Sequence, residues 1–211
     1  MVLRRLCRLY LGLALYGVSL ALMVHAALGL DPWDVFHQGF AGRAGLSFGT
    51  ATVLTGVLVL LCWIPLRQRP GLGTVSNVLV IGPTVDLVSP LLPTPHGLLP
   101  RFALFAVGLV LNAAATGWYL GAGFGPGPRD GLMTGIHRRT GHSLRLVRTA
   151  IEVSVLIVGF LLGGTVGLGT LAYALGIGPL VQFFLPRLTP GQTGGKENRA
   201  ARRSGDAAED R

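Results

Sequence analysis

Few side chains in the apolar parts of this sequence can do chemistry, and Asp86 is the most conspicuous of them. It lies inside a long apolar stretch, three residues after Gly82-Pro83. An ionisable group within a membrane span is costly, so such a residue is by default a candidate for binding an ion, a proton or a polar solute. The alternative interpretation is an acid near the membrane surface that pairs with a neighbouring helix.

The dipeptide Gly82-Pro83 itself predicts a break in a helix, because proline removes one backbone hydrogen bond and clashes with the preceding turn. The same dipeptide recurs as Gly178-Pro179. Paired breaks in two halves of a chain indicate a site near the middle of the membrane, although two packing kinks without a ligand explain them equally well. The candidate residues for a central path are Gly82, Pro83, Asp86, Gly178, Pro179, Gln182, Asn77 and Tyr173.

No set of residues in the chain has the spacing of a catalytic centre. The sequence contains no HExxH zinc motif, no phosphate-binding loop and no serine nucleophile turn with its histidine and acid. Its two cysteines, Cys7 and Cys62, match no metal or redox spacing. We therefore expect a protein that is not an enzyme and that has no catalytic residues, no metal and no cofactor.

The elements that must position the candidate residues are apolar helices. Half of the residues are hydrophobic, 13% are charged and the mean hydropathy is +0.58, whereas a soluble domain has about 25% charged residues. Six apolar stretches reach or approach the roughly 20 residues that a spanning helix needs. They cover residues 9–30, 48–66, 72–92, 102–124, 149–162 and 166–186. The predicted fold class is an all-α membrane protein with six transmembrane helices.

The chain contains an internal repeat with an offset of 96 residues. The frame Gly-x-x-Pro-x-Asp-x-x-x-x-Gly begins at Gly29 and again at Gly125, and the phrases GLGT and IGP also recur at this offset. Between residues 29 and 86, 20 of 58 pairs are identical without a gap. Chance similarity between apolar helices explains shared Leu and Val, but it does not keep Gly, Pro, Asp and Thr in register.

Each half then holds three spanning helices, and an odd number means that the second half enters the membrane from the opposite side. We expect two inverted repeats, residues 8–92 and 100–186, related by a pseudo-two-fold axis in the membrane plane. The frame at Gly29 would then face the outside, and its copy at Gly125 would face the cytoplasm.

The distribution of basic residues predicts the orientation. If the N-terminus is cytoplasmic and six helices cross, 16 of the 18 Lys and Arg residues lie on the cytoplasmic side, and only Arg43 and Arg101 lie outside. Such a bias sets the orientation of a membrane protein. It also accounts for the net charge of +9 without any binding of nucleic acid.

Each copy of the repeated frame has the residues of a helix start. Asp31 suits the N-cap, Pro32 the first helical position and Asp34 the third, and Pro128 and Asp130 repeat this pattern. About ten residues follow, which is too short for a span, so each segment is interpreted as a short interfacial or re-entrant helix. Two interpretations stay open: these residues only start a helix, or the helix ends line the mouth of a central path.

The composition changes abruptly near residue 189. Residues 1–188 form the predicted transmembrane domain, whereas residues 189–211 are polar and rich in Gly, Ala and Arg. This composition is typical of a disordered segment, and the predicted topology makes it a cytoplasmic tail.

Three phrases resemble the YczE/YyaS/YitT family of bacterial integral membrane proteins: DPWDVFHQG from Asp31, GLSFGTATVLTG from Gly45 and PGLGTVSNVLVIGPTVD from Pro70. The resemblance covers residues 8–186. It is closest to the YczE-like branch, because the YitT branch has an additional soluble C-terminal domain. The resemblance implies a six-helix protein of the bacterial inner membrane and supplies neither a substrate nor catalytic residues.

The sequence favours a small secondary transporter or permease-like protein, on the basis of the repeated halves, the paired helix breaks and the acid within a span. The competing hypothesis is a membrane accessory or scaffold protein that transports nothing and supports a partner. The expected surroundings are lipid, and the expected ligand is a small solute or a coupling ion. A homodimer is an open alternative, and the predicted location is the bacterial inner membrane with both termini in the cytoplasm.

Overall fold

The computed structural model describes residues 2–188, and these residues are helical throughout apart from turns and loops. The predicted tail, residues 189–211, lies outside the described residues. The elements in chain order are α1 (Val2–Ala26), α2 (Pro32–Ala44), α3 (Phe48–Trp63), α4 (Leu72–Val88), the 3-10 turn η1 (Ser89–Leu91), α5 (Leu98–Leu120), α6 (Pro128–Thr140), α7 (Leu144–Leu161) and α8 (Leu168–Leu188). The order of a long helix, a short helix and two further helices therefore occurs twice, as the repeat predicts.

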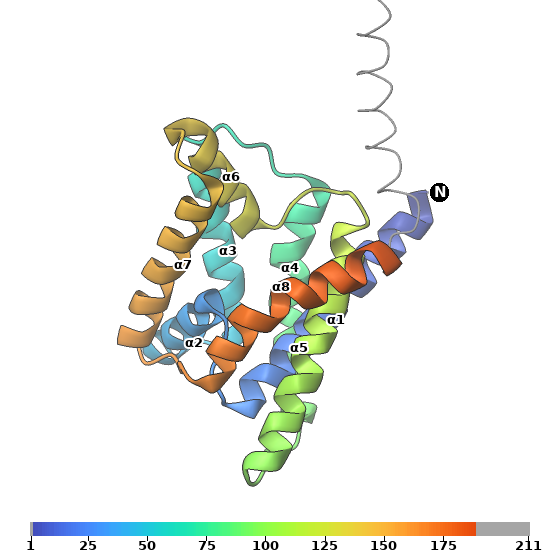
Figure 1. The fold of residues 1–211 in the computed structure, drawn as a ribbon, viewed down its shortest axis with the longest axis vertical. Helices are drawn as coiled ribbons and strands as arrows, with labels where there is room; N and C mark the ends of the chain where they lie inside the picture. Colours follow the sequence, from blue (N-terminus) through green and yellow to red (C-terminus); the bar gives the residue numbers. More distant parts are fainter. Residues whose placement is uncertain (1, 189–211) are drawn as a thin grey trace, which may run out of the picture.

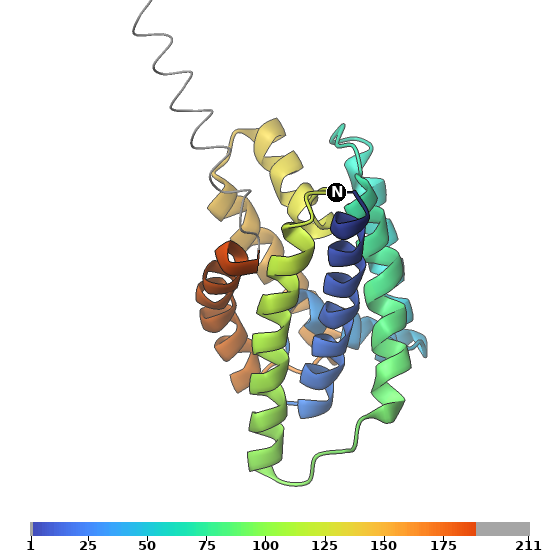
Figure 2. The same cartoon turned by 90° about the vertical axis from the view of Figure 1, so that its right-hand side faces the viewer.

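The helices form two layers (Figure 1). In the first layer α4 packs on α1, α1 on α5, and α5 on α8, and Figure 2 shows α1 between α4 and α5. In the second layer α2 packs on α3 and α7, and α6 packs on α3 and α7. The layers are joined mainly where α3 packs on α4, whereas α7 and α8 make no comparable contact.

Only the first layer consists of helices that are long and apolar enough to cross a membrane by themselves. They are α1, α4 with η1, α5 and α8. The segment of α2 and α3 passes the same test only as a pair bent by 112°. The described residues therefore contain four candidate spans, or five with the bent pair, where the sequence predicts six.

Two of the six predicted spans, those of α3 and α7, do not pass this test by themselves, and each has a physical reason. Helix α3 has 16 residues and is about 24 Å long at 1.5 Å per residue. The predicted span over residues 149–162 belongs to a helix that begins at Leu144 and includes Arg145, Arg148 and Glu152. The six-span architecture is therefore not confirmed, although the all-helical fold is.

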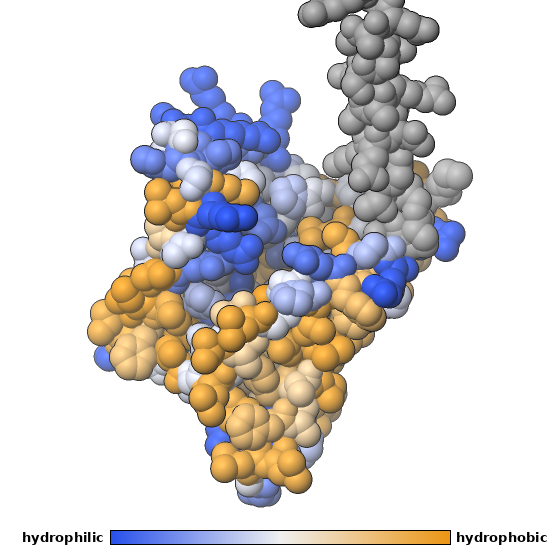
Figure 3. Space-filling view, viewed as in Figure 1, coloured by the Kyte–Doolittle hydropathy of each residue, from blue (hydrophilic) through white to orange (hydrophobic). Residues whose placement is uncertain are grey.

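Figure 3 shows that hydrophobic side chains cover the lower part of one face of the molecule. Hydrophilic side chains gather at the end where α6 meets α7, and they continue into the middle of this face between α7 and α8. Large hydrophobic residues are exposed on α3, α5 and α8, as in Leu58, Val107 and Leu175. An apolar exterior of this extent suits lipid surroundings.

Contacts between the two halves occur in reciprocal pairs. The Arg5 guanidinium donates to the carbonyl oxygen of Ala122 at 2.9 Å, and 96 residues later Arg101 donates to the carbonyl oxygen of Ala26 at 2.7 Å. The start of each long helix thus contacts the end of the other, so α1 and α5 run antiparallel and make equivalent contacts with each other.

The last helices of the two halves, α4 and α8, make a second reciprocal pair of contacts. The backbone N–H of Gly73 donates to the carbonyl oxygen of Phe124 at 2.9 Å, and that of Gly169 donates to the carbonyl oxygen of Leu28 at 2.7 Å. Both donors lie in the first turn of their helix, where backbone N–H groups have no intrahelical partner. Each half therefore supplies a partner to the helix start of the other.

The repeated glycine that opens each frame has a conformational reason. Gly29 has φ +108° and Gly125 has φ +115°, and L-residues with a Cβ rarely adopt such values. A Cβ on Gly29 would also lie 2.6 Å from the backbone nitrogen of Gly167. Glycine at both positions lets the chain turn from the end of a long helix into the short helix that follows.

Candidate functional site

The start of α2 has the predicted cap at Asp31, but the carboxylate of Asp34 contacts other side chains and not the helix start. Asp31 is the N-cap, and its Oδ1 accepts a hydrogen bond from the backbone N–H of Asp34 at 2.7 Å. The sequence pattern predicts that the Asp34 carboxylate returns to the cap N–H. Instead it points away from the helix start and binds two other side chains, which leaves Asp31 as the cap.

The first of these side chains is Arg129, which comes from the start of α6 in the other half. Its Nη1 lies 3.1 Å from Asp31 Oδ2, and its Nη2 lies 3.1 Å from Asp34 Oδ1. Its guanidinium carbon also lies 5.3 Å from the centroid of the Trp33 ring, within the range of a cation–π contact. The planar guanidinium thus joins two carboxylates and an aromatic ring at one point.

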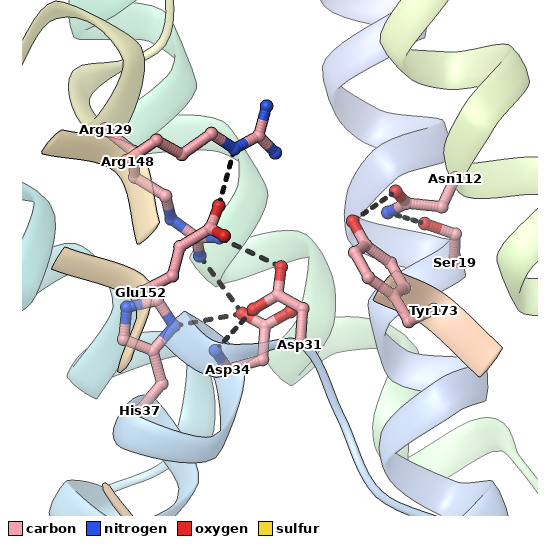
Figure 4. Close-up of polar contacts among 9 residues, drawn as sticks. All are labelled: Ser19, Asp31, Asp34, His37, Asn112, Arg129, Arg148, Glu152 and Tyr173. Carbon is pink, nitrogen blue, oxygen red and sulfur yellow. Dashed lines mark hydrogen bonds and ion pairs between the residues drawn. The ribbon is translucent and has the colours of Figure 1, made fainter. Parts of the chain in front are cut away.

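The second partner of Asp34 is His37, one turn further along α2. His37 Nδ1 lies 3.1 Å from Asp34 Oδ1, and both side chains are almost fully buried. Figure 4 shows the histidine, the two aspartates and Arg129 together. The two starts of the repeated frame therefore meet in one common interior region.

A cavity of about 500 Å³ adjoins this cluster. All eight α-helices of residues 2–188, or the loops that start them, contribute to its wall. Its aromatic members are Trp33, Tyr16, Tyr119 and Tyr173. This volume lies within the range of small-molecule sites, which are concave, largely apolar and supplied with a few polar groups.

Arg148 and Tyr173, two further polar residues of the cavity wall, already have partners. Arg148 Nε lies 2.8 Å from Glu152 Oε1 on α7, and their i,i+4 spacing in the sequence predicts such a pair. On the other side of the cavity, the Tyr173 hydroxyl donates to Asn112 Oδ1 at 3.1 Å, and Asn112 Nδ2 donates to Ser19 Oγ at 2.9 Å. This chain of hydrogen bonds joins α8, α5 and α1 beside the cavity (Figure 4).

Three polar groups converge near Gly127, the N-cap of α6. A Cβ placed on Gly127 would lie 3.4 Å from both the Tyr119 hydroxyl oxygen and Asp130 Oδ2, and 3.9 Å from Asn77 Nδ2. All four residues line the cavity. Among the described residues Asp130 takes part in no ion pair, unlike its repeat mate Asp34.

The cavity wall contains buried polar atoms without partners. Trp33 Nε1 and Thr55 Oγ1 have no hydrogen-bond partner among the described residues, and neither does Asp34 Oδ2 in the adjoining cluster. Trp33 and Thr55 both line the cavity and are 6% and 5% exposed. Buried polar groups are nearly always hydrogen-bonded, so the unpaired atoms of Trp33 and Thr55 are candidate contacts for water or a ligand in the cavity.

The structure brings only some of the predicted site residues to this cavity. Asn77, Tyr173, Gly178 and Gln182 line it, as do Pro32, Pro128 and Asp130 from the two helix starts. Asp34 lies behind Asp31 in the adjoining cluster. Gly82, Pro83, Asp86 and Pro179 do not line the cavity.

Asp86 instead contacts a neighbouring helix, as in the alternative interpretation of this acid. Its Oδ2 accepts a hydrogen bond from the Ser47 hydroxyl at 2.5 Å, and its Oδ1 accepts one from the backbone N–H of Gly49 at 2.8 Å. It therefore joins the end of α4 to the start of α3. Gly82 lies at the same contact, packed against the backbone of Gly49, while Pro83 and Pro179 lie inside continuous helices.

The sequence pattern does not reveal the residues that dominate the cavity. In the sequence Arg129 is only a basic residue of a loop, and Asp31 is only a helix cap. A signal was present, because Arg129 occupies the repeat position of Trp33 inside an otherwise retained frame. The phrase GLGT predicts Thr74 as the cap of the helix that follows, but Gly71 is the N-cap of α4, and the Thr74 hydroxyl accepts the Gly71 N–H at 3.2 Å.

The described residues contain no group of three or more His, Cys, Asp or Glu side chains arranged for a metal ion. The arrangement instead offers a polar, partly aromatic interior in an apolar helical protein. These features define an all-helical membrane protein with an internal cavity between its two halves.

Comparison with known proteins assigns the chain to a family. Residues 3–186 match DUF6198, a family of unknown function, and the chain belongs to this family. An uncharacterised protein of Haemophilus influenzae is 41% identical over 177 residues, covering 84% of this chain and 81% of that protein.

Two relatives come from Bacillus subtilis. The uncharacterised membrane protein YczE is 34% identical over 173 residues, covering 82% of this chain and 80% of YczE. The protein YyaS is 27% identical over 180 residues, covering 83% of this chain and 90% of YyaS. The resemblance to the YczE/YyaS group is therefore confirmed, and no solved structure matches the chain.

Proposed function

We propose that the protein is a small-solute transporter or permease-like protein with one central site between its two halves. The observation that carries this proposal is the cavity of about 500 Å³, to which all eight α-helices contribute. A site shared by two related halves is typical of transporters, in which one half moves against the other around the solute.

We further propose that the halves are inverted in the membrane, that α3 and α7 complete six crossings, and that both termini are cytoplasmic in a bacterial inner membrane. The reciprocal contacts of Arg5 and Arg101 support the inversion, because they relate α1 to an antiparallel α5. The excess of basic residues on one side supports the orientation.

The position of α8 supports access to the cavity from outside the protein. Helices α7 and α8 both contribute to the cavity wall, yet they do not pack extensively on each other. Gly178 and Gln182 of α8 line the cavity and are exposed. In this arrangement the gap between α7 and α8 is the mouth of the cavity.

A pair of variants on α8 tests the proposal. Ala174 lines the cavity, whereas Ala172, two residues away, is exposed but does not line it. We expect Ala174→Trp to fill the cavity and Ala172→Trp to leave it open. Both proteins are purified, screened for thermal stabilisation by inorganic ions, amines, carboxylates and sugars, and reconstituted into liposomes for uptake of each stabilising solute.

The expected result is a solute that stabilises and enters liposomes with the wild type and Ala172→Trp, but not with Ala174→Trp. If every stabilising solute acts equally on both variants, or if none enters liposomes, the transport proposal is wrong. The accessory role would then be the better description of this protein.

A further inference from the structure

From the charges and aromatic groups of the cavity we infer that its ligand is a small organic ammonium cation that also carries an oxygen acceptor. This inference rests on the proposed function and names the substrate class of the same site. Its first support is the balance of charges around the cavity.

The cationic groups of the cavity are already neutralised. Arg129 contacts two carboxylates, those of Asp31 and Asp34, and Arg148 contacts Glu152. A guanidinium whose donors face two carboxylates is not available to bind an anionic solute. The arrangement therefore disfavours an anion, although arginines line the cavity.

The carboxylates, in contrast, are in excess. With His37 neutral, four carboxylates, those of Asp31, Asp34, Asp130 and Glu152, face two guanidinium groups, which leaves two formal negative charges. The N-termini of α2 and α6 contribute about half a positive charge each. An excess of roughly one negative charge remains after this contribution, in an interior where charges interact strongly.

Asp130 is the carboxylate of this group that contacts no arginine within residues 2–188, so we assign the excess negative charge to it. It has no ion-pair partner among the described residues, and its Oδ2, the Tyr119 hydroxyl and the Asn77 amide all lie within 4 Å of the point that a Cβ on Gly127 would occupy. Tyr16 is edge-on to Tyr119, with ring centroids 6.3 Å apart, and Tyr173 also lines the cavity. An acid among aromatic rings is the environment that recognises ammonium groups through charge and cation–π attraction.

The unpartnered polar atoms supply the second part of the ligand. Trp33 Nε1 is a donor only, and Thr55 Oγ1 can donate or accept. Both are buried in the cavity wall without partners among the described residues. A ligand with a hydroxyl or carbonyl oxygen would satisfy the Trp33 donor, whereas a bare alkylammonium ion would leave it unpaired.

Choline is a suitable probe, because it combines a quaternary ammonium with one hydroxyl group. We expect choline chloride to stabilise the detergent-purified full chain against heat, tetramethylammonium chloride to do so more weakly, and sodium chloride or sodium acetate at equal ionic strength to have no such effect. Ala174→Trp removes the choline effect, and Ala172→Trp retains it.

Three variants test the assigned counterion. Asp130→Asn should weaken choline binding by about tenfold or more, because a hydrogen bond or contact to a charged group is worth more than a neutral one. Asp130→Glu keeps the charge and should retain binding. Asp86→Asn removes an acid outside the cavity and should bind choline as the wild type does, which controls for the loss of charge alone.

Two outcomes would overturn the inference: choline binds Asp130→Asn as tightly as the wild type, or choline does not bind at all. If an anion or a neutral solute instead shows stabilisation that Ala174→Trp removes, the cation assignment is wrong while the transport proposal stands. If Asp130→Asn does not fold, the comparison of choline with acetate on Ala174→Trp and Ala172→Trp decides the question.

Discussion

The two halves of the molecule are related at most positions but differ where their last two helices meet. In the first half, α3 packs closely on α4, and the backbones of Gly49 and Gly82 come into direct contact. In the second half, α7 and α8 stay apart, and a Cβ on Gly178 would meet nothing within 4 Å. Related sequences have thus produced one closed and one open helix pair.

The side chains of α3 and α7 explain the difference. A Cβ on Gly56 would lie 2.9 Å from Val78, so α3 depends on glycine where it meets α4. The repeat positions of Gly49 and Gly56 are Arg145 and Glu152. Long charged side chains prevent close approach of two backbones, whereas small residues permit it. The open pair therefore follows from replacing glycines with charged residues on one face.

The largest expected effect comes from Arg129, which joins α6 of the open half to α2 of the closed half. Arg129→Met leaves the carboxylates of Asp31 and Asp34 buried without a counterion, which should cost about 3–5 kcal/mol of stability. Thermal or denaturant unfolding in detergent measures this loss. Arg138→Met on the same helix is the control, with an expected change within about 0.5 kcal/mol. Equal stability of the two variants would show that the ion pair does not hold the halves together.

A matched pair of glycine substitutions tests the packing difference directly. Gly82→Leu forces a side chain into the α3 backbone, and we expect overpacking to cost about 3 kcal/mol. Gly178→Leu, at the repeat position, enters open space and should leave stability nearly unchanged while it obstructs the cavity. The apparent melting temperatures of the two variants provide the measurement. Similar losses in both would mean that α7 and α8 are also closely packed in the protein.

The smallest expected effect concerns the polar contact that accompanies the closed pair. Asp86→Ala removes the acceptor for Ser47 and for the Gly49 N–H, which should cost about 1–2 kcal/mol, as for the loss of a helix cap. Gln182→Ala, at the repeat position, makes no such contact and should change stability by no more than about 0.5 kcal/mol. A transport defect in Asp86→Ala at normal stability would restore Asp86 as a candidate for the central path.

Several features of the fold were predictable because they depend on neighbouring residues in the chain. Helix α2 begins at Pro32 with Asp31 as its cap, as the order of residue types indicates. The short helix also recurs in the second half. The number of spans was less predictable, because α7 combines the length of a span with Arg145, Arg148 and Glu152.

The candidate site was predictable only in part. Asn77 and Tyr173 were found because the repeat pairs two polar positions, and both line the cavity. Asp86 stood out because it is an acid in an apolar stretch, yet its hydrogen bonds to Ser47 and Gly49 place it at a helix start. Hydropathy identifies an acid in an apolar stretch but does not reveal which neighbour it faces.

The sequence by itself determined the apolar helices, the cap of α2 and the repeat of 96 residues, since helix periodicity, capping and glycine conformations are local properties of the chain. Only the tertiary structure decided that Arg129 meets Asp31 and Asp34, 98 and 95 residues away. It also decided that α3 closes on α4 while α7 stays apart from α8. Such contacts depend on how closely two backbones can approach, which is settled by the side chains of both helices together.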